Sequence, residues 1–140
     1  EIIDHYSQRE HIKIHHQLGD EAYYSPSRDC IVLPLVEQFR SVGEFYSTAF
    51  HEITHSTGHR TRLNRLKATA HFGNAEYSKE ELTAEIGAAA LLNYAGIETN
   101  DTFRNNAAYI QNWLTVLKND KRMVVAASGA AAKAVDYILG

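Results

Sequence analysis

The first third of the chain changes between apolar and polar positions over short distances. The spacing predicts a helix over residues 1–9, followed by strands near residues 12–14, 22–24 and 30–33. Pro26 predicts a turn before the last of these strands, and Pro34 ends that strand because proline has no N–H for a neighbouring strand. We therefore expect a short helix and a small, mostly antiparallel sheet.

From Ser41 onward the apolar positions recur at helical intervals. Ser41 and Glu44 form a capping-box sequence, which begins a helix that Gly58 is expected to end, and Ser78 and Glu81 form a second box. The pattern predicts helices over residues 41–58, 78–95, 102–119 and 123–139, with a loop over residues 60–75. The predicted fold is one α+β domain spanning the chain (1–140), with the sheet packed on the first of these helices and a helical C-terminal half.

The composition is that of an ordinary globular protein of 140 residues, long enough to form a hydrophobic core. Its net charge of −3 gives no overall basic surface for nucleic acid. Cys30 is the single cysteine, so no internal disulfide can form and a cytoplasmic location is expected. No apolar stretch is long enough to cross a membrane, and no signal peptide is recognised. Because the chain begins with Glu1 rather than Met, we expect it to be part of a longer protein.

The residues most informative about chemistry lie in the helix that follows Ser41. His51, Glu52 and His55 form the pattern H-E-x-x-H. On a helix the two histidines lie one turn apart on the same face, where their imidazoles can bind one Zn²⁺ ion. Glu52 lies beside the first histidine, where a carboxylate can accept a proton from a zinc-activated water. The pattern predicts a zinc-dependent peptidase with Glu52 as the catalytic base.

A catalytic zinc site needs three protein ligands, and the motif supplies only two. His59 would lie about 12 Å from His51 along a helix axis, too far to share one ion. The third ligand is therefore expected to be a carboxylate from a later helix. We assign Glu81 as this ligand and Glu85, one turn later, as the acid that orients a histidine; the reverse assignment stays open. The alternative without a metal is that Glu81 only caps its helix and Glu85 is solvated.

Other residues near the motif suggest further roles. Three of them are candidate donors to the oxyanion of a tetrahedral intermediate, namely His59, His71 and Tyr77. If the strand of residues 30–33 is an edge beside the cleft, it could bind substrate backbone by strand addition. A basic cluster follows the motif and consists of Arg60, Arg62, Arg65 and Lys67. This cluster is either a solvated loop or a surface that binds DNA phosphates.

Several blocks of sequence resemble one known family in the same order along the chain. They are residues 22–34, 45–59, 62–65, 77–86 and 107–113. Together they resemble the zincin-like metallopeptidase domain of plasmid and phage "polyvalent" proteins, the C-terminal domain of ArdC-type antirestriction proteins and of TraC-type plasmid DNA primases. The resemblance implies a zincin fold and an origin in a mobile element. It also implies an N-terminal domain that binds single-stranded DNA, which we expect to lie outside these 140 residues.

Two hypotheses for function follow from the motif and the resemblance. The first is a peptidase that acts on a protein or peptide substrate, with zinc held by His51, His55 and Glu81. The second is a zinc-stabilised interaction domain of an antirestriction or conjugation protein, in which the metal serves the fold and no turnover occurs. Glu52 favours the first hypothesis, since a structural site needs no base. Other divalent ions could compete with zinc for this ligand set.

Overall fold

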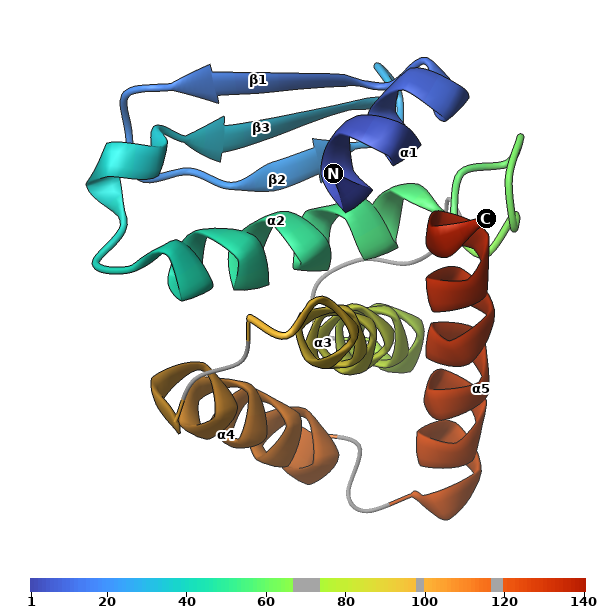
Figure 1. The fold of residues 1–140 in the computed structure, drawn as a ribbon. Coiled ribbons are helices and arrows are strands. Elements are labelled where there is room, and N and C mark those ends of the chain that lie inside the picture. The colour runs from blue at the N-terminus through green and yellow to red at the C-terminus, as the bar shows by residue number, and fades with distance from the viewer. Residues whose placement is uncertain (67–73, 98–99, 117–119) are drawn as a thin grey trace.

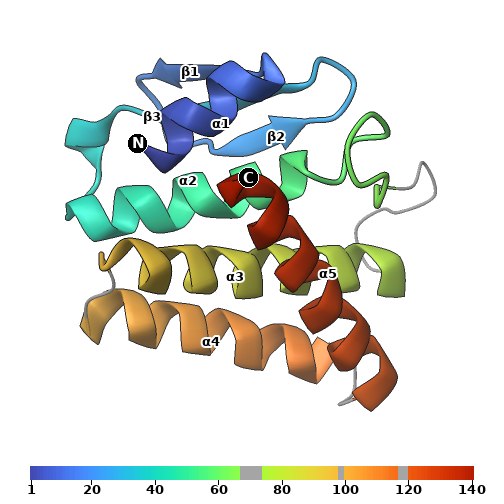
Figure 2. The same cartoon turned by 45° about the vertical axis from the view of Figure 1, so that its right-hand side comes forward.

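The computed structural model describes residues 1–66, 74–97, 100–116 and 120–140. Its elements stack in layers, with a small sheet above α2 (Val42–Ser56), α3 (Ala75–Ala95) and α4 (Asn100–Val116) (Figure 1). Helix α5 (Lys121–Leu139) runs across this stack, and the short α1 (Ile2–Glu10) lies beside the sheet (Figure 2). The α+β class and the helical C-terminal half predicted from the sequence are confirmed. Among the helices in the described ranges, none combines the length and apolar composition needed to cross a membrane.

The sheet has three strands in the order β1–β3–β2: β1 (Lys13–Gln17), β2 (Tyr23–Ser25) and β3 (Cys30–Pro34). β2 pairs antiparallel with β3, but β1 runs parallel to β3. The sheet is therefore mixed, and the expectation of a mostly antiparallel sheet was wrong. Parallel strands need a connection of about a dozen residues, and the segment between β1 and β3 is long enough to carry β2 along the opposite edge. Strand spacing alone does not reveal this.

Helix α2 packs its apolar face against the central strand. Its N-cap is Ser41, whose hydroxyl accepts a hydrogen bond from the Glu44 N–H at 3.1 Å, as the capping-box sequence predicts. Phe50 and Ile53 on α2 are buried together with Ile31 of β3, at 0–1% exposure. This burial fixes the rotation of α2 about its axis, so its opposite side is turned toward the other helices.

The close packing after α2 depends on Gly58, which has a different role from the one expected. The helix ends at Ser56, and Gly58 is not in the left-handed conformation of a helix stop. A Cβ at Gly58 would lie 2.8 Å from Leu66, so glycine is needed where the following segment folds back over the end of the helix. Backbone hydrogen bonds from Arg65 and Leu66 to the Gly58 carbonyl hold that segment.

Helix α3 begins earlier than the sequence predicts. Its N-cap is Asn74, which accepts a hydrogen bond from the Tyr77 N–H at 2.8 Å, and Ser78 is buried inside the helix. The Ser78–Glu81 capping box does not form, because Asn74 caps the helix one turn earlier. Gly96 ends α3 in the left-handed conformation (φ 71°), as expected.

The last two helices follow the prediction closely. Helix α4 is described from Asn100 to Val116, and the predicted end at residues 117–119 lies outside the described residues. Helix α5 begins two residues earlier than predicted because Asp120 caps it, accepting hydrogen bonds from the N–H groups of Arg122 and Met123. α5 packs along α3 through buried alanines, which lets the two helices approach closely.

A network of ion pairs joins the two ends of the chain to the segment after α2. Arg62 donates hydrogen bonds to both carboxylate oxygens of Asp29 at 2.8 Å and to Glu10 at 3.0 Å. Glu10 also accepts a hydrogen bond from the Tyr137 hydroxyl at 2.8 Å. Arg9 donates to the backbone carbonyl of Tyr137. The end of α5 is therefore fastened beside α1, as both overall views show (Figures 1 and 2).

Candidate metal centre

The two histidines of the motif project from the side of α2 that faces α3. Because Phe50 and Ile53 point into the core beneath the sheet, His51 and His55 are turned toward the helical layers. Their ring centroids are 4.7 Å apart, as one helical turn requires. The single helix thus presents two imidazoles to the same point in space, as the sequence predicts.

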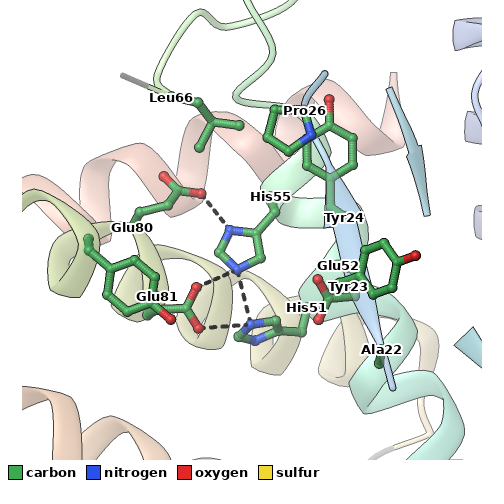
Figure 3. A pocket seen from close by; sticks show the side chains of 11 residues that line it. Ala22, Tyr23, Tyr24, Pro26, His51, Glu52, His55, Leu66, Glu80 and Glu81 are labelled. Atoms are coloured by element: carbon green, nitrogen blue, oxygen red, sulfur yellow. Dashed lines mark hydrogen bonds and ion pairs between the residues drawn. The ribbon is translucent and has the colours of Figure 1, made fainter. Parts of the chain in front are cut away.

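A close contact between α2 and α3 brings the third donor within reach. A Cβ at Gly87 of α3 would lie 2.7 Å from the Thr54 Cγ2 atom of α2, so only glycine allows this approach. Glu81 lies on the same helix, nearly two turns before Gly87, and extends its carboxylate toward both histidines (Figure 3). The tertiary packing of two helices therefore completes the candidate site.

The donor atoms of His51, His55 and Glu81 have the spacing of a metal site. One ligand atom from each residue lies within 4.8 Å of the others. The two Nε2 atoms are 3.1 Å apart, and the Glu81 oxygens lie 2.7 Å from His55 Nε2 and 3.4 Å from His51 Nε2. Tetrahedral ligands at zinc–nitrogen distances of about 2.0–2.1 Å are separated by about 3.3 Å. The residues present therefore fit a single small divalent ion.

The hydrogen bonds behind the histidines explain why a cation belongs there. His51 Nδ1 lies 2.8 Å from a Glu85 oxygen, and His55 Nδ1 lies 2.7 Å from a Glu80 oxygen. An ionised carboxylate can only accept, so each imidazole carries its proton on Nδ1. When both rings are neutral, their Nε2 lone pairs point at each other and at the Glu81 carboxylate. Such an arrangement is repulsive unless a positive charge lies between the donors.

Glu80 is a site residue that the sequence analysis did not identify. Its carboxylate accepts hydrogen bonds from His55 Nδ1, from Arg65 Nε at 2.7 Å and from an Arg65 terminal nitrogen at 3.0 Å. Arg65 is itself held by the backbone carbonyl of Thr54 at 2.8 Å. Two adjacent acids, Glu80 and Glu81, could have indicated a cation site, but the sequence around them was interpreted as a capping box. The partner Arg65 lies fifteen positions earlier and reaches Glu80 only through the folding of the loop.

The carboxylates and the histidines shift one another's protonation. Burial alone would lower the pKa of His55, but hydrogen bonds to Glu80 and Glu81 outweigh it and raise the pKa to about 9. The same balance, with Glu81 and Glu85 as partners, raises the pKa of His51 well above its ordinary value. Burial would raise the pKa of Glu81, yet both histidines hold it far below its usual range. The site thus attracts positive charge, whether as protons or as a metal ion.

Glu52 lines a cavity that His51, His55 and Glu81 also line, and its side chain is buried, at 8% exposure. Burial raises the pKa of Glu52, and the nearby histidines and a hydrogen bond from the backbone of Tyr24 only partly oppose the increase. A carboxylate whose pKa is raised is a stronger base than an ordinary one. Its position between the histidines and β2 suits a group that acts on a molecule bound in the cavity (Figure 3).

This first cavity has a volume of about 350 Å³ and opens between β2 and α3. Besides the motif and the acids Glu80 and Glu81, its walls are mostly apolar or aromatic: Ala22, Tyr23, Tyr24, Pro26, Leu66 and Tyr77. Strand β2 forms one wall through Tyr23 and Tyr24, and among the described strands it pairs with β3 alone, at the edge of the sheet. β3 itself is paired on both sides, so the condition under which residues 30–33 could bind substrate backbone as an edge strand is not met. β2 takes that position instead.

The three candidate oxyanion donors lie in different places. Tyr77 lines the first cavity, and burial together with the charges of Glu81 and Glu52 raises the pKa of its hydroxyl. His59 lies beyond the end of α2, where its Nδ1 atom is 2.8 Å from the Thr61 hydroxyl, and it does not line either of the two cavities that His51 borders. His71 lies outside the described residues.

Two of the four residues in the basic cluster after the motif are neutralised inside the fold. The side chain of Arg62 is 3% exposed and is paired with Glu10 and Asp29, whereas Arg65 is paired with Glu80. Arg60 is exposed, and Lys67 lies outside the described residues. Arg62 and Arg65 are therefore not available to bind phosphates, and their structural use explains why basic residues are grouped here.

The comparison with known sequences agrees with this geometry. A family model described as zincin-like metallopeptidase matches residues 1–130. The DNA primase TraC of Escherichia coli is 39% identical over 139 residues, which is 99% of this chain and 9% of the primase. The uncharacterised protein y4eC of Sinorhizobium fredii is 32% identical over 120 residues, which is 86% of this chain and 38% of that protein. The chain thus spans a minor part of these relatives.

Solved structures show the same fold. The Mn(II)-bound crystal structure of the antirestriction protein ArdC from plasmid R388 has a TM-score of 0.77 and 37% identity, and the match covers 98% of this chain and 50% of ArdC. The metal-free structure of ArdC has a TM-score of 0.75 at 37% identity, with 98% and 48% covered. The resemblance to ArdC-type and TraC-type proteins seen in the sequence is confirmed.

Proposed function

This chain belongs to the zincin-like metallopeptidase family, and we propose that it is a metal-dependent peptidase. The observation that carries the proposal is the convergence of three metal donors beside a buried carboxylate. His51, His55 and Glu81 bring their donor atoms within 4.8 Å of one another, and Glu52 lines the same cavity. A site that only stabilised the fold would have no use for a buried base next to the ion.

The roles of the chain's own residues follow from their positions. A zinc ion bound to the three donors would act as a Lewis acid that lowers the pKa of a water molecule and polarises the scissile carbonyl. Glu52 accepts the proton of the attacking water and passes it to the leaving nitrogen, so one water is consumed per bond and no other reactant is needed. Tyr77 keeps its proton at neutral pH and can donate it in a hydrogen bond to the developing oxyanion.

The orienting groups belong to the same proposal. Glu85 and Glu80 hold the Nδ1 protons of His51 and His55, and this leaves both Nε2 atoms free to bind the metal. The assignment of Glu81 as ligand and Glu85 as orienting acid is favoured, because Glu81 approaches the Nε2 side of both rings and Glu85 approaches Nδ1 of one. Zinc is the ion we propose on the basis of this His–His–Glu set. The related ArdC structure holds Mn(II).

Edge strand β2 is the element we propose to bind the substrate backbone. One side of β2 is paired with β3 and the other faces the first cavity, where an extended peptide can add as a further strand. The ordinary setting of such a domain is a longer protein, since its relatives TraC and ArdC extend well beyond it. We propose a role in a mobile-element protein of this type, in the cytoplasm, where the buried free thiol of Cys30 stays reduced.

The decisive test is the Glu52→Gln variant, which keeps the size of the side chain but removes the base. We expect metal content equal to that of the wild type, measured by elemental mass spectrometry, and a loss of peptide hydrolysis of at least about 100-fold. Glu37→Gln, an exposed change on the surface, is the matched control and should leave both values unaltered. Hydrolysis that survives in a metal-loaded Glu52→Gln protein would contradict the mechanism.

The same variant separates the peptidase from a non-catalytic interaction domain. If the metal only stabilises the fold, neither wild type nor Glu52→Gln will hydrolyse peptides, and both will support the biological effect of the full-length protein equally. If hydrolysis is the function, the variant will bind metal and fold normally but lose that effect. Measuring antirestriction or conjugation in cells alongside hydrolysis in vitro distinguishes the two cases.

A further inference from the structure

The candidate metal centre lies between two cavities rather than at the closed end of one. A second cavity of about 350 Å³ opens on the side of α4. His51, Glu52 and Glu81 line both cavities, so the three site residues form the boundary between them. A wall of aromatic rings is continuous across this boundary, because Tyr77 of the first cavity packs edge-to-face on Trp113 of the second at 5.9 Å.

The second cavity continues into a third cavity along α2. Ser47, Thr48 and Tyr109 line both, and the third cavity, of about 360 Å³, extends to the start of α2. The three cavities therefore follow α2 from β2, past the metal donors, to α4. A molecule that filled all three would be long and would extend on both sides of the metal donors.

The charged groups at the site are unsuited to holding a chain terminus. An enzyme that removes terminal residues needs an uncommitted acid for the α-amino group or a cation for the α-carboxylate. Among the described residues that line the first two cavities there is no Lys or Arg, and Arg40 in the third cavity is paired with Glu44 at 3.0 Å. Glu80 is held by Arg65 and His55, and Glu85 by His51. The remaining acids, Glu52 and Glu81, are the proposed base and the proposed ligand.

The two sides of the centre differ in the side chains that they can accept. On the β2 side the walls are apolar and aromatic, with Ala22, Pro26 and Leu66 beside Tyr23. On the α4 side Ser47, Thr48 and Asn112 provide polar groups next to the exposed ring of Tyr109, which is 56% exposed. The first side suits an apolar or aromatic residue, and the second suits neutral polar residues.

From these observations we propose that the site is an endopeptidase site, which cleaves an internal bond of an extended protein segment. The segment crosses the metal centre from β2 to α4, with an apolar or aromatic residue on the β2 side. The inference rests on the proposed peptidase function, but it makes a separate statement about how the substrate lies. The experiments that test it must therefore measure peptide binding as well as peptide hydrolysis.

The experiment uses a library of decapeptides that are acetylated at the N-terminus and amidated at the C-terminus, with free-ended versions for comparison. We expect metal-loaded protein to cut blocked and free peptides at the same internal bond, within about twofold in kcat/KM, as mass spectrometry of the products will show. Removing residues from either end so that one side of the centre is empty should lower kcat/KM at least tenfold. Release of single residues from free-ended peptides alone would overturn the proposal.

Variants test the two sides of the groove independently. Thr48→Trp fills the α4 side and should lower kcat/KM at least tenfold for decapeptides, but not for peptides truncated on that side, with metal affinity unchanged. The control is Val42→Trp, because Val42 lies on the same helix as Thr48, is 60% exposed and lines none of these three cavities. Tyr23→Ala should reduce the preference for apolar residues on the β2 side, whereas Tyr94→Ala should have no effect.

A binding measurement separates this proposal from the proposed function. Fluorescence anisotropy of blocked decapeptides, labelled with fluorescein on a lysine side chain, is measured with the Glu52→Gln protein. If no peptide is hydrolysed but blocked peptides bind, and Thr48→Trp weakens binding at least tenfold, the peptidase function fails and the two-sided groove stands. If no blocked decapeptide binds, or if Thr48→Trp and Val42→Trp behave alike, the groove itself is refuted.

Discussion

At the scale of single residues, each histidine donor has its own carboxylate partner. Glu85 accepts from His51 and Glu80 accepts from His55, and Arg65 fixes Glu80 from behind through two hydrogen bonds. The arrangement holds the orientation and the Nδ1 proton of both rings before any ion binds, which lowers the reorganisation needed on binding. In the site as we propose it, the acids of α3 divide into one ligand and two orienting groups.

Metal affinity measured in a series of variants tests this division. Glu81→Ala should abolish stoichiometric metal binding, because it removes a donor. Glu80→Gln and Glu85→Gln should each weaken binding about 10–100-fold, because the ring is less well held and less basic. Isothermal titration with zinc, with Glu37→Gln as the control, provides the measurement. Loss of the metal in Glu85→Ala with retention in Glu81→Ala would reverse the assignment of ligand and orienting acid.

At the scale of elements, the site depends on how closely α2 and α3 approach. The two helices meet at Gly87 and Thr54, where any Cβ on residue 87 would overlap the Thr54 side chain. The Thr54 hydroxyl donates to its own helix at Phe50, so the residue does not depend on α3 for a hydrogen bond. Glycine at this position decides whether Glu81 reaches the histidines.

Gly87→Ala is therefore expected to lower the free energy of unfolding by about 1–3 kcal/mol through overpacking, and to weaken metal binding because α2 and α3 move apart. Chemical denaturation and zinc titration measure the two effects. The double variant Gly87→Ala/Thr54→Ala should recover most of the loss, since it removes the two Thr54 atoms, Cγ2 and Oγ1, that would lie within 3.0 Å of a new Cβ.

The control for this variant is Gly129→Ala in α5, where a new Cβ meets nothing within 4 Å. That change should raise stability by about 0.5–1 kcal/mol, because alanine is the better helix former. Equal effects at residues 87 and 129, or simple additivity of Gly87→Ala and Thr54→Ala, would disprove the steric explanation.

At the scale of the whole molecule, the network around Arg62 joins α1, the turn before β3, the segment after α2 and the end of α5. Arg62 binds Asp29 and Glu10, and Glu10 in turn binds Tyr137. Asp29 also accepts a hydrogen bond from the Tyr24 hydroxyl at 2.7 Å, which connects the network to edge strand β2. The wall of the first cavity is thus fixed by contacts from distant parts of the chain.

The pH dependence of stability tests this network. Hydrogen bonds from Arg62, opposed by burial and aided by Tyr24, lower the pKa of Asp29 from its ordinary value of 3.8. A group with a lowered folded-state pKa contributes its full stabilisation above the ordinary value and loses it as the pH falls toward the folded value. Asparagine tolerates the positive φ of 51° at this position. We therefore expect Asp29→Asn to lower the free energy of unfolding by about 2 kcal/mol at pH 7. Below about pH 4 the difference from wild type should shrink.

Urea unfolding at pH 7, 5, 4 and 3, with chelator present so that metal binding does not contribute, measures this effect. Asp20→Asn, an exposed change in a turn, is the control and should stay within about 0.5 kcal/mol of wild type at every pH. A difference between wild type and Asp29→Asn that is constant from pH 7 to pH 3 would show that the charge of Asp29 is not what matters.

The local chemistry of this protein was readable from its sequence. Helical periodicity places His51 and His55 of the H-E-x-x-H pattern on the same face of a helix that begins after Ser41. Strand and helix positions were also close, because apolar spacing and cap residues act over a few neighbouring positions. The likeness to a zincin-like family rested on blocks of sequence in order, which need no coordinates.

Contacts between distant segments were decided only by the tertiary structure. The parallel pairing of β1 with β3, the edge position of β2 and the use of Glu80 and Arg65 each join parts of the chain whose mutual placement no local pattern encodes. The sequence offered two competing caps for α3, and the structure uses Asn74, which leaves Ser78 buried inside the helix. The sequence thus determined which donors were available, and the close packing of α2 on α3 determined which of them meet, because side-chain spacing along one helix carries no information about the next.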